Sequence, residues 1–120
     1  MEKVNLREAF DAVEEPWSPR LAGELNGQAV KLARADGEFV RHRHDDADEL
    51  FLVVDGRLRI ELYEKPDVTL EAGEFVVVPS GVDHRPVAEG SAEILLFEPA
   101  GTRNTGDVDS ELTAEPERLD

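Results

Sequence analysis

The stretch "RHRHDDADELFLVVDG", residues 41–56, contains two of the three histidines in this 120-residue chain. Side chains on a β-strand alternate between faces, so His42 and His44 point to the same side, about 7 Å apart. The same alternation sends Arg41 and Arg43 to the opposite, solvated side. Two imidazoles at this separation can share one metal ion, although a histidine pair on an amphipathic strand can also be simply solvated.

The four residues after His44, "DDAD" at 45–48, are typical of a chain reversal. Glu49 lies five residues after His44, an interval that would place it on the wrong face of one continuous strand. A reversal at 45–48 instead brings Glu49 back beside the histidines from the next strand. Taken alone, Glu49 is equally well read as an ordinary acid at the end of a strand.

The third histidine, His84, closes the stretch "GEFVVVPSGVDH" at residues 73–84. Pro79 ends a buried strand there, and Gly81 permits a sharp return of the chain. A lone histidine in such a loop is most often a surface residue. The return of the chain at Gly81 can nevertheless place the imidazole of His84 in the same interior as those of the other two histidines. The sequence therefore predicts a metal site formed by His42, His44, Glu49 and His84.

The chain around these residues has the pattern of an all-β, antiparallel fold. Short β-rich runs, each closed by Gly, Pro or Asp, follow one another without an intervening helical segment, which predicts a barrel or sandwich. The expected strands cover residues 28–35, 38–44, 49–54, 57–63, 67–70, 74–79, 84–88 and 92–99. Asp55 and Gly56 are expected to form a tight hairpin turn between the third and fourth runs.

The expected organisation is a single domain with an N-terminal arm at 1–27, a barrel at 28–99 and an acidic tail at 100–120. Apolar residues recur at helical spacing between Leu6 and Val13, which predicts a short helix. Pro16 and Pro19 then end the helix, and Trp17 is expected to dock the arm onto the barrel.

Two groups of apolar residues lead to further expectations. If Glu49 points inward, an outward apolar stripe results, which another strand layer, the arm or a second subunit must cover. The stripe consists of Leu50, Leu52 and Val54. This stripe suggests a homodimer.

A second group of apolar residues is expected to line a pocket or to belong to the core. Its members are Phe51, Val53, Phe75, Val77, Leu95 and Phe97.

Composition excludes several classes of partner. The chain has 28 acidic and 13 basic residues, a net charge of −15, which opposes binding to nucleic acid or to an anionic membrane. No cysteine is present, so disulfides and thiolate ligands are excluded. Arginine outnumbers lysine ten to three, as in proteins adapted to molar salt, although an ordinary acidic surface remains an alternative. The charged start and the lack of a long apolar run lead us to expect a soluble, cytoplasmic protein.

The two histidine segments together resemble the paired motifs of the cupin family. The first motif reads Gly37, "EFVR", "HRH" at 42–44, "DDAD", Glu49, "LFLVVD" and Gly56. The second reads Gly73, "EFVVV", Pro79, Ser80, Gly81, "VD" and His84. The first spacer has four residues where five is commoner, and Ala88 stands where the second motif ends in Asn. The loss of that Asn removes a polar group from the expected surroundings of the site.

This resemblance implies a jelly-roll, or double-stranded β-helix, barrel that pairs as a homodimer. It also implies a divalent transition metal ion held by His42, His44, Glu49 and His84. Three imidazoles and a carboxylate suit Fe, Mn, Ni, Cu or Zn, and four ligands leave two positions of an octahedral ion open. Cupins include oxygenases, decarboxylases, isomerases and epimerases, which implies a metal-dependent enzyme for a small organic molecule, of oxygenase or isomerase type. The alternative is a non-catalytic module that senses or stores a metal or small ligand.

Neighbouring aspartates are the expected acceptors for the second ring nitrogens of the histidines. The candidates are Asp45, Asp46, Asp48 and Asp83.

Overall fold

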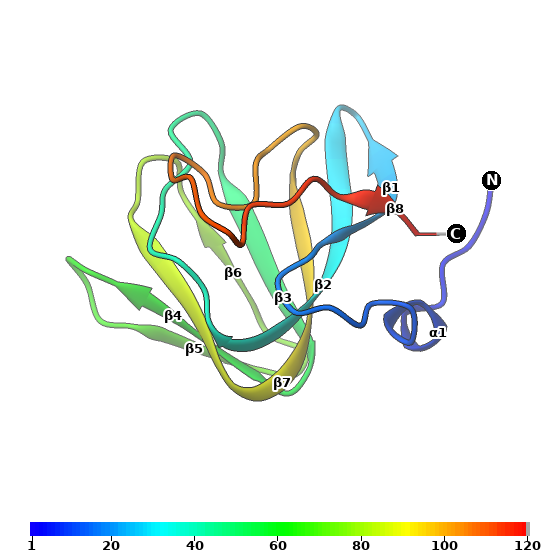
Figure 1. Ribbon diagram of the computed structural model, residues 1–120, viewed down its shortest axis with the longest axis horizontal. Coiled ribbons are helices and arrows are strands. Elements are labelled where there is room, and N and C mark those ends of the chain that lie inside the picture. The colour runs from blue at the N-terminus through cyan, green and yellow to red at the C-terminus, as the bar shows by residue number, and fades with distance from the viewer. Residues whose placement is uncertain (120) are drawn as a thin grey trace.

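The computed structural model describes residues 1–119, which form one short helix and a set of mostly antiparallel strands around a common interior (Figure 1). The helix is α1 (Leu6–Phe10). The strands are β1 (Arg20–Leu25), β2 (Gln28–Glu38), β3 (Glu49–Asp55), β4 (Arg57–Leu62), β5 (Val68–Glu71), β6 (Phe75–Val78), β7 (His84–Pro99) and β8 (Glu117–Arg118). None of the helical residues described forms a helix long and apolar enough to cross a membrane.

Strand β7 joins the two halves of the fold. Its residues 84–87 pair with β4, its residues 93–97 pair with β3, and β2 pairs with it along nearly its whole length. Strand β5 extends the β4 side, and β6 extends the β3 side. Figure 1 shows the β4–β5 hairpin on one flank and β1 and β2 on the other. The predicted all-β, antiparallel class is confirmed, and the sheet does not close on itself.

Several strand boundaries differ from the sequence-based expectation. Residues 84–99 form one continuous strand instead of two. In the run at 38–44, Glu38 belongs to β2 and pairs with Val87, and the rest of the run forms a single bridge, between His42 and His84. Residues 20–25, expected to belong to an irregular arm, form β1 and pair with β2 across a turn at Asn26 and Gly27. Both turn residues have positive φ, 51° and 77°, as a tight hairpin requires.

The expected hairpin at Asp55 and Gly56 was wrong. Strands β3 and β4 each pair with a different part of β7, so the chain passes at Gly56 from one half of the fold to the other. Gly56 has a φ of +89°, and a Cβ there would lie 3.0 Å from backbone and side-chain atoms of Ala92. Glycine is needed because the corner brings two backbones into close approach.

The core fills the interior between the halves, and a smaller cluster lies outside β2. Phe51 and Val53 point into the main core, as predicted. In the smaller cluster, Phe10 and Val13 pack against Leu32 and partly cover Val54, so the N-terminal arm covers one end of the predicted outward stripe. Helix α1 ends at Phe10, three residues earlier than expected.

Candidate metal centre

The structure brings the four predicted ligands together at one end of the interior. The backbones of His42 and His84 pair through two hydrogen bonds of 2.9 Å, which places the two histidine segments side by side. Residues 45–48 reverse the chain, and Glu49 then begins β3 with its side chain inward. One atom from each of His42, His44, Glu49 and His84 lies within 4.8 Å of the others.

Backbone carbonyl groups orient two of the imidazole rings. Nδ1 of His42 lies 2.9 Å from the oxygen of Val40, and Nδ1 of His84 lies 2.9 Å from the oxygen of Val82. In each case Nδ1 donates its proton, so Nε2 carries the free lone pair and faces the centre. The expectation that aspartates accept these bonds was wrong, because carbonyl groups two residues upstream take that place. Asp45 and Asp83 instead form surface ion pairs with arginines.

The inward atoms of the cluster lack hydrogen-bond partners. Nε2 of all three histidines and Oε1 of Glu49 are buried without a partner in the described structure. Oε1 lies 3.3 Å from Nε2 of His44 and 3.4 Å from Nε2 of His84. Ligands bound at about 2 Å to one transition ion are separated by about 3 to 4 Å, so these spacings fit such an ion. Buried polar atoms are rarely left unsatisfied, and a shared ion would satisfy all four.

Burial and mutual contacts set the charge of these groups. Burial lowers the pKa of His42 to about 4, and the neighbouring His84 adds to the effect, so His42 is neutral at physiological pH. Burial acts to raise the pKa of Glu49, but interactions with His44 and His84 outweigh it and hold the pKa below its usual range. A neutral imidazole and an ionised carboxylate are the forms that bind a metal.

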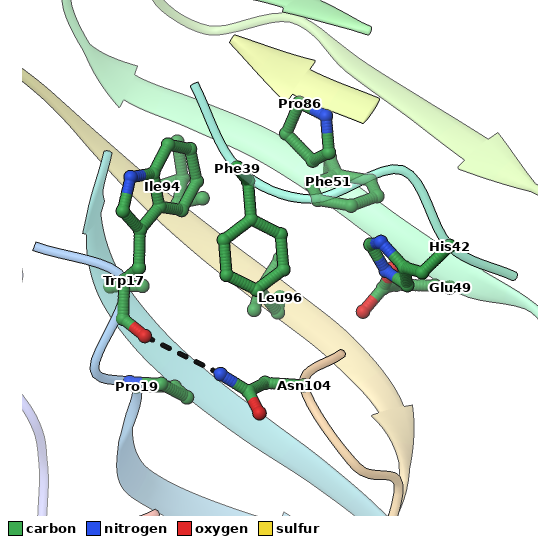
Figure 2. Close-up of a pocket in the computed structure, with 11 residues that line it drawn as sticks. Trp17, Pro19, Phe39, His42, Glu49, Phe51, Pro86, Ile94, Leu96 and Asn104 are labelled. Carbon is green, nitrogen blue, oxygen red and sulfur yellow. Dashed lines mark hydrogen bonds between the residues drawn. The ribbon is translucent and has the colours of Figure 1, made fainter. Parts of the chain in front are cut away.

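A small cavity of about 30 Å³ adjoins the centre, with His42 and Glu49 at one end (Figure 2). Its walls are mostly apolar and include Phe39, Phe51 and Leu96. A cavity of this size has room for about two water molecules. The expected pocket lining was only partly right. Phe51 does line the cavity, whereas Phe75 and Val77 point outward with exposed fractions of 63% and 47%.

Two segments distant in sequence meet over this cavity. Trp17 stacks against Phe39 with ring centroids 4.8 Å apart, and its indole donates a hydrogen bond of 2.9 Å to the oxygen of Asp36. Asn104 donates to the oxygens of Trp17 and Leu112, at 3.4 and 2.9 Å. Figure 2 shows the Trp17–Asn104 bond beside the cavity. The arm and the C-terminal segment therefore form part of the site.

The C-terminal segment also packs directly on the histidine segment. The amide of Asp107 donates to the oxygen of Arg43 at 3.1 Å, and the amide of Arg43 donates to Asp107 Oδ1 at 3.0 Å. Between Asn104 and Asp107, Thr105 is fully buried, and a Cβ at Gly106 would lie 2.2 Å from the oxygen of Arg43. Sequence reasoning missed these contacts because no residue pattern pairs a tail with a particular strand.

A buried ion pair near the centre was also missed. Lys31 and Glu98 are 2% and 1% exposed, and Nζ of Lys31 lies 3.4 Å from Oε1 of Glu98. The alternation along β7 could have identified Glu98, since it shares the inner face with Ile94 and Leu96. Leu95 and Phe97 were expected on that face instead, as pocket lining or core. The opposite alternation is observed.

Comparison with known proteins agrees with this fold. The family model described as "Cupin domain" matches residues 29–98. The chain is 36% identical over 81 residues to the uncharacterized protein YdbB of Bacillus subtilis, covering 68% of this chain and 72% of YdbB. These matches define the class, and the chain belongs to the cupin family.

Solved structures show the same fold. A cupin-2 domain containing protein from Shewanella frigidimarina superposes with a TM-score of 0.77 at 41% identity, covering 80% of this chain and 93% of that protein. Hydroquinone 1,2-dioxygenase from Sphingomonas sp. TTNP3, solved with 4-hydroxybenzoate bound, superposes with a TM-score of 0.68. That match covers 84% of this chain and 80% of the dioxygenase, and at 18% identity the likeness concerns the fold alone.

Proposed function

We propose that this cupin binds a divalent transition metal ion and acts as a metal-dependent enzyme on a small organic molecule, of oxygenase or isomerase type. One observation carries the proposal: four buried donor atoms, three Nε2 and one carboxylate oxygen, converge without protein partners. No thiolate is present and three donors are imidazoles, which favours Fe, Mn, Ni, Cu or Zn over Ca or Mg.

The residues around the site define what the protein itself contributes. The carbonyls of Val40 and Val82 fix the ring orientations, and burial keeps His42 neutral. Glu49 supplies the single negative charge. A bound ion would supply Lewis acidity or a position for oxygen activation. The apolar walls exclude water from the ligands, which strengthens electrostatic interactions at the site.

The cavity favours a small and mostly apolar substrate. Its walls contain aromatic and aliphatic side chains, and Asn104 is the polar lining residue outside the metal cluster. Asn104 already bonds to Trp17 and Leu112, so a molecule larger than about two waters would displace this contact. Trp17 is the single tryptophan of the chain, and its fluorescence therefore reports on such a displacement.

Metal analysis followed by turnover assays tests the proposal. Protein purified without added metal in high salt is expected to contain about one transition ion per chain. Oxygen-uptake and isomerase assays on small acids, thiols, diketones and sugars then identify the substrate class. Glu49→Ala is expected to lose metal and turnover, whereas the exposed control Glu64→Ala keeps both. Full metal retention in Glu49→Ala would contradict the proposed ligand set.

The alternative is a non-catalytic module that senses or stores a metal or small ligand. The composition of the cavity supports this alternative, because its described lining adds no acid or base to His42 and Glu49. Metal binding together with a Trp17 fluorescence change on ligand addition, but without turnover on any substrate class, would favour the module. The net charge of −15 opposes a role in binding nucleic acid.

We further propose a homodimer formed through the outer face of β3, β6 and β7. Leu50 pairs with both Val77 and Phe97, and Leu52 pairs with Phe75 and Leu95. We call this set the outer patch: Leu50, Leu52, Phe75, Val77, Leu95 and Phe97. Of these, Leu95 also packs against the cluster formed with the N-terminal arm. The outer patch contains no ionisable side chain. Each chain has a net charge of −15, so two copies repel each other where charged surfaces meet. A second copy that docks through the same uncharged patch avoids this repulsion.

Mass measurement in high salt tests the homodimer. The unmodified chain is expected to run as a dimer and Phe75→Asp as a monomer, because a charge buried in an apolar contact is not compensated. Leu25→Asp, at an exposed apolar position outside the outer patch, serves as the control and should remain dimeric. A monomer for the unmodified chain would refute this interface.

We expect the protein to act in the cytoplasm.

A further inference from the structure

The buried pair Lys31–Glu98 is the strongest unexplained feature of the interior. Removing two charged groups from water costs several kcal/mol for each ion, so such pairs are uncommon in cores. Nζ of Lys31 donates to Oε1 of Glu98 at 3.4 Å and to the oxygen of Thr102 at 3.0 Å. Oε2 of Glu98 is buried without a partner. An apolar pair at these positions would pack the interior without this cost.

The pair lies next to the metal centre and not in the cavity. Leu50 pairs with Phe97, so Glu49 and Glu98, the adjoining residues of the two strands, take neighbouring inner positions. Side chains at such directly opposed positions of an antiparallel pair have Cβ atoms about 5 Å apart, so the carboxyl groups of Glu49 and Glu98 lie close enough to interact. The cavity lining includes Glu49 but neither Lys31 nor Glu98. The pair therefore lies beside a candidate ligand and outside the space for a substrate.

We propose that Lys31 and Glu98 are positioning residues that hold the Glu49 carboxylate in the orientation that binds the metal ion. Lys31 fixes Glu98, and Glu98 lies beside Glu49 on the neighbouring strand. Carboxylates that bind metals are commonly held by a second layer of hydrogen bonds. The contact from Thr102 to Lys31 extends this arrangement to the C-terminal segment. This inference rests on the proposed function, since it requires that Glu49 bind a metal.

Co²⁺ binding by the full chain tests the proposal, measured by calorimetry and by the visible absorption of the bound ion. Glu98→Leu and the double variant K31M/E98L are expected to bind Co²⁺ about 10- to 100-fold more weakly, with an altered spectrum. The double variant leaves no unpaired buried charge, so it is expected to fold with an unchanged or higher melting temperature. Glu98→Gln can still accept from Lys31 and donate to Glu49, and is expected to recover most of the affinity.

A matched control is R57M/E71L, which removes the exposed Arg57–Glu71 ion pair on β4 and β5. Its Co²⁺ affinity should equal that of the unmodified chain. Unchanged affinity and spectrum in K31M/E98L would show that the pair is structural only and would refute the positioning role. Lack of Co²⁺ binding by the unmodified chain would instead refute the proposed function itself. If K31M/E98L does not fold, Glu98→Asp and Glu98→Gln replace it in the test. Weaker Co²⁺ binding by Glu98→Asp, together with near-normal binding by Glu98→Gln, supports the positioning role. Unchanged Co²⁺ binding by Glu98→Asp refutes it.

Discussion

Replacing Gly106 by alanine is expected to destabilise the protein and weaken its metal site together. Gly106 has a φ of +57°, and an added Cβ would lie 2.2 Å from the carbonyl oxygen of Arg43 and 3.0 Å from Cδ2 of His42. Carbon and oxygen atoms rarely approach closer than about 3.3 Å, so the C-terminal segment must move by about 1 Å. The carbonyl of Arg43 belongs to the backbone and has little freedom to move away.

The size of the effect follows from two losses. Alanine in the left-handed region costs about 1 kcal/mol more than glycine. The shift also breaks the backbone hydrogen bond from Asp107 to Arg43, which contributes about 1 kcal/mol. The sum is about 2 kcal/mol, before any loss of packing around the buried Thr105. For a domain of this size that corresponds to a fall in melting temperature of roughly 8 °C.

Thermal and urea unfolding of the metal-free protein measure this change. Gly101→Ala is the matched control, because Gly101 lies in the same segment with a φ of +89° and an added Cβ there meets no atom within 4 Å. The control therefore carries the backbone cost alone, about 1 kcal/mol. Metal affinity is expected to fall in Gly106→Ala only, because only that Cβ reaches His42. Equal stability and equal affinity of the two variants would refute the reasoning.

Three further outcomes are expected. The metal-free protein should lose about 3 kcal/mol of its free energy of unfolding as the pH falls from 6.5 to 4. In this range the unfolded chain binds a proton at His42, whereas in the folded protein burial lowers the pKa of His42 to about 4 and opposes protonation. Urea titrations across this range should show no such loss in His42→Gln. Asn104→Ala should cost about 2 kcal/mol in chemical unfolding, because it removes side-chain bonds to Leu112 and Ala114, and an unchanged midpoint would contradict the described contacts. Lys31→Met should cost about 1 to 3 kcal/mol, because it leaves the Glu98 carboxyl, whose pKa burial raises to about 9, without its partner. Arg57→Met, at an exposed pair, should leave the melting temperature nearly unchanged.

The sequence predicted three of the four clustered side chains from short-range rules, and the fourth, His84, from the paired motifs that resemble those of the cupin family. Alternation on an extended segment places His42 and His44 on one face, and a reversal at 45–48 returns Glu49 to them. The structure contains both features. The metal-binding role of the cluster stays a prediction.

Sequence reasoning failed where the pattern carried no information on direction. Residues 94–97, "ILLF", are all apolar, so alternation cannot show which of them face inward. The structure places Ile94 and Leu96 inside, and with them Glu98. The same ambiguity in "FVVV" at 75–78 led to the wrong assignment of Phe75 and Val77 to the interior.

By itself, the sequence determined the fold class and the composition of the histidine–glutamate cluster, because strand alternation and short turns set His42, His44 and Glu49, and the second glycine–proline–histidine motif added His84. Only the tertiary structure decided which distant segments close over that cluster. Trp17 meets Asn104, Gly106 lies against Arg43, and Lys31 meets Glu98 across separations of 63 to 87 residues. Contacts of that range depend on the paths of whole strands and on the space left between them, which no local pattern encodes.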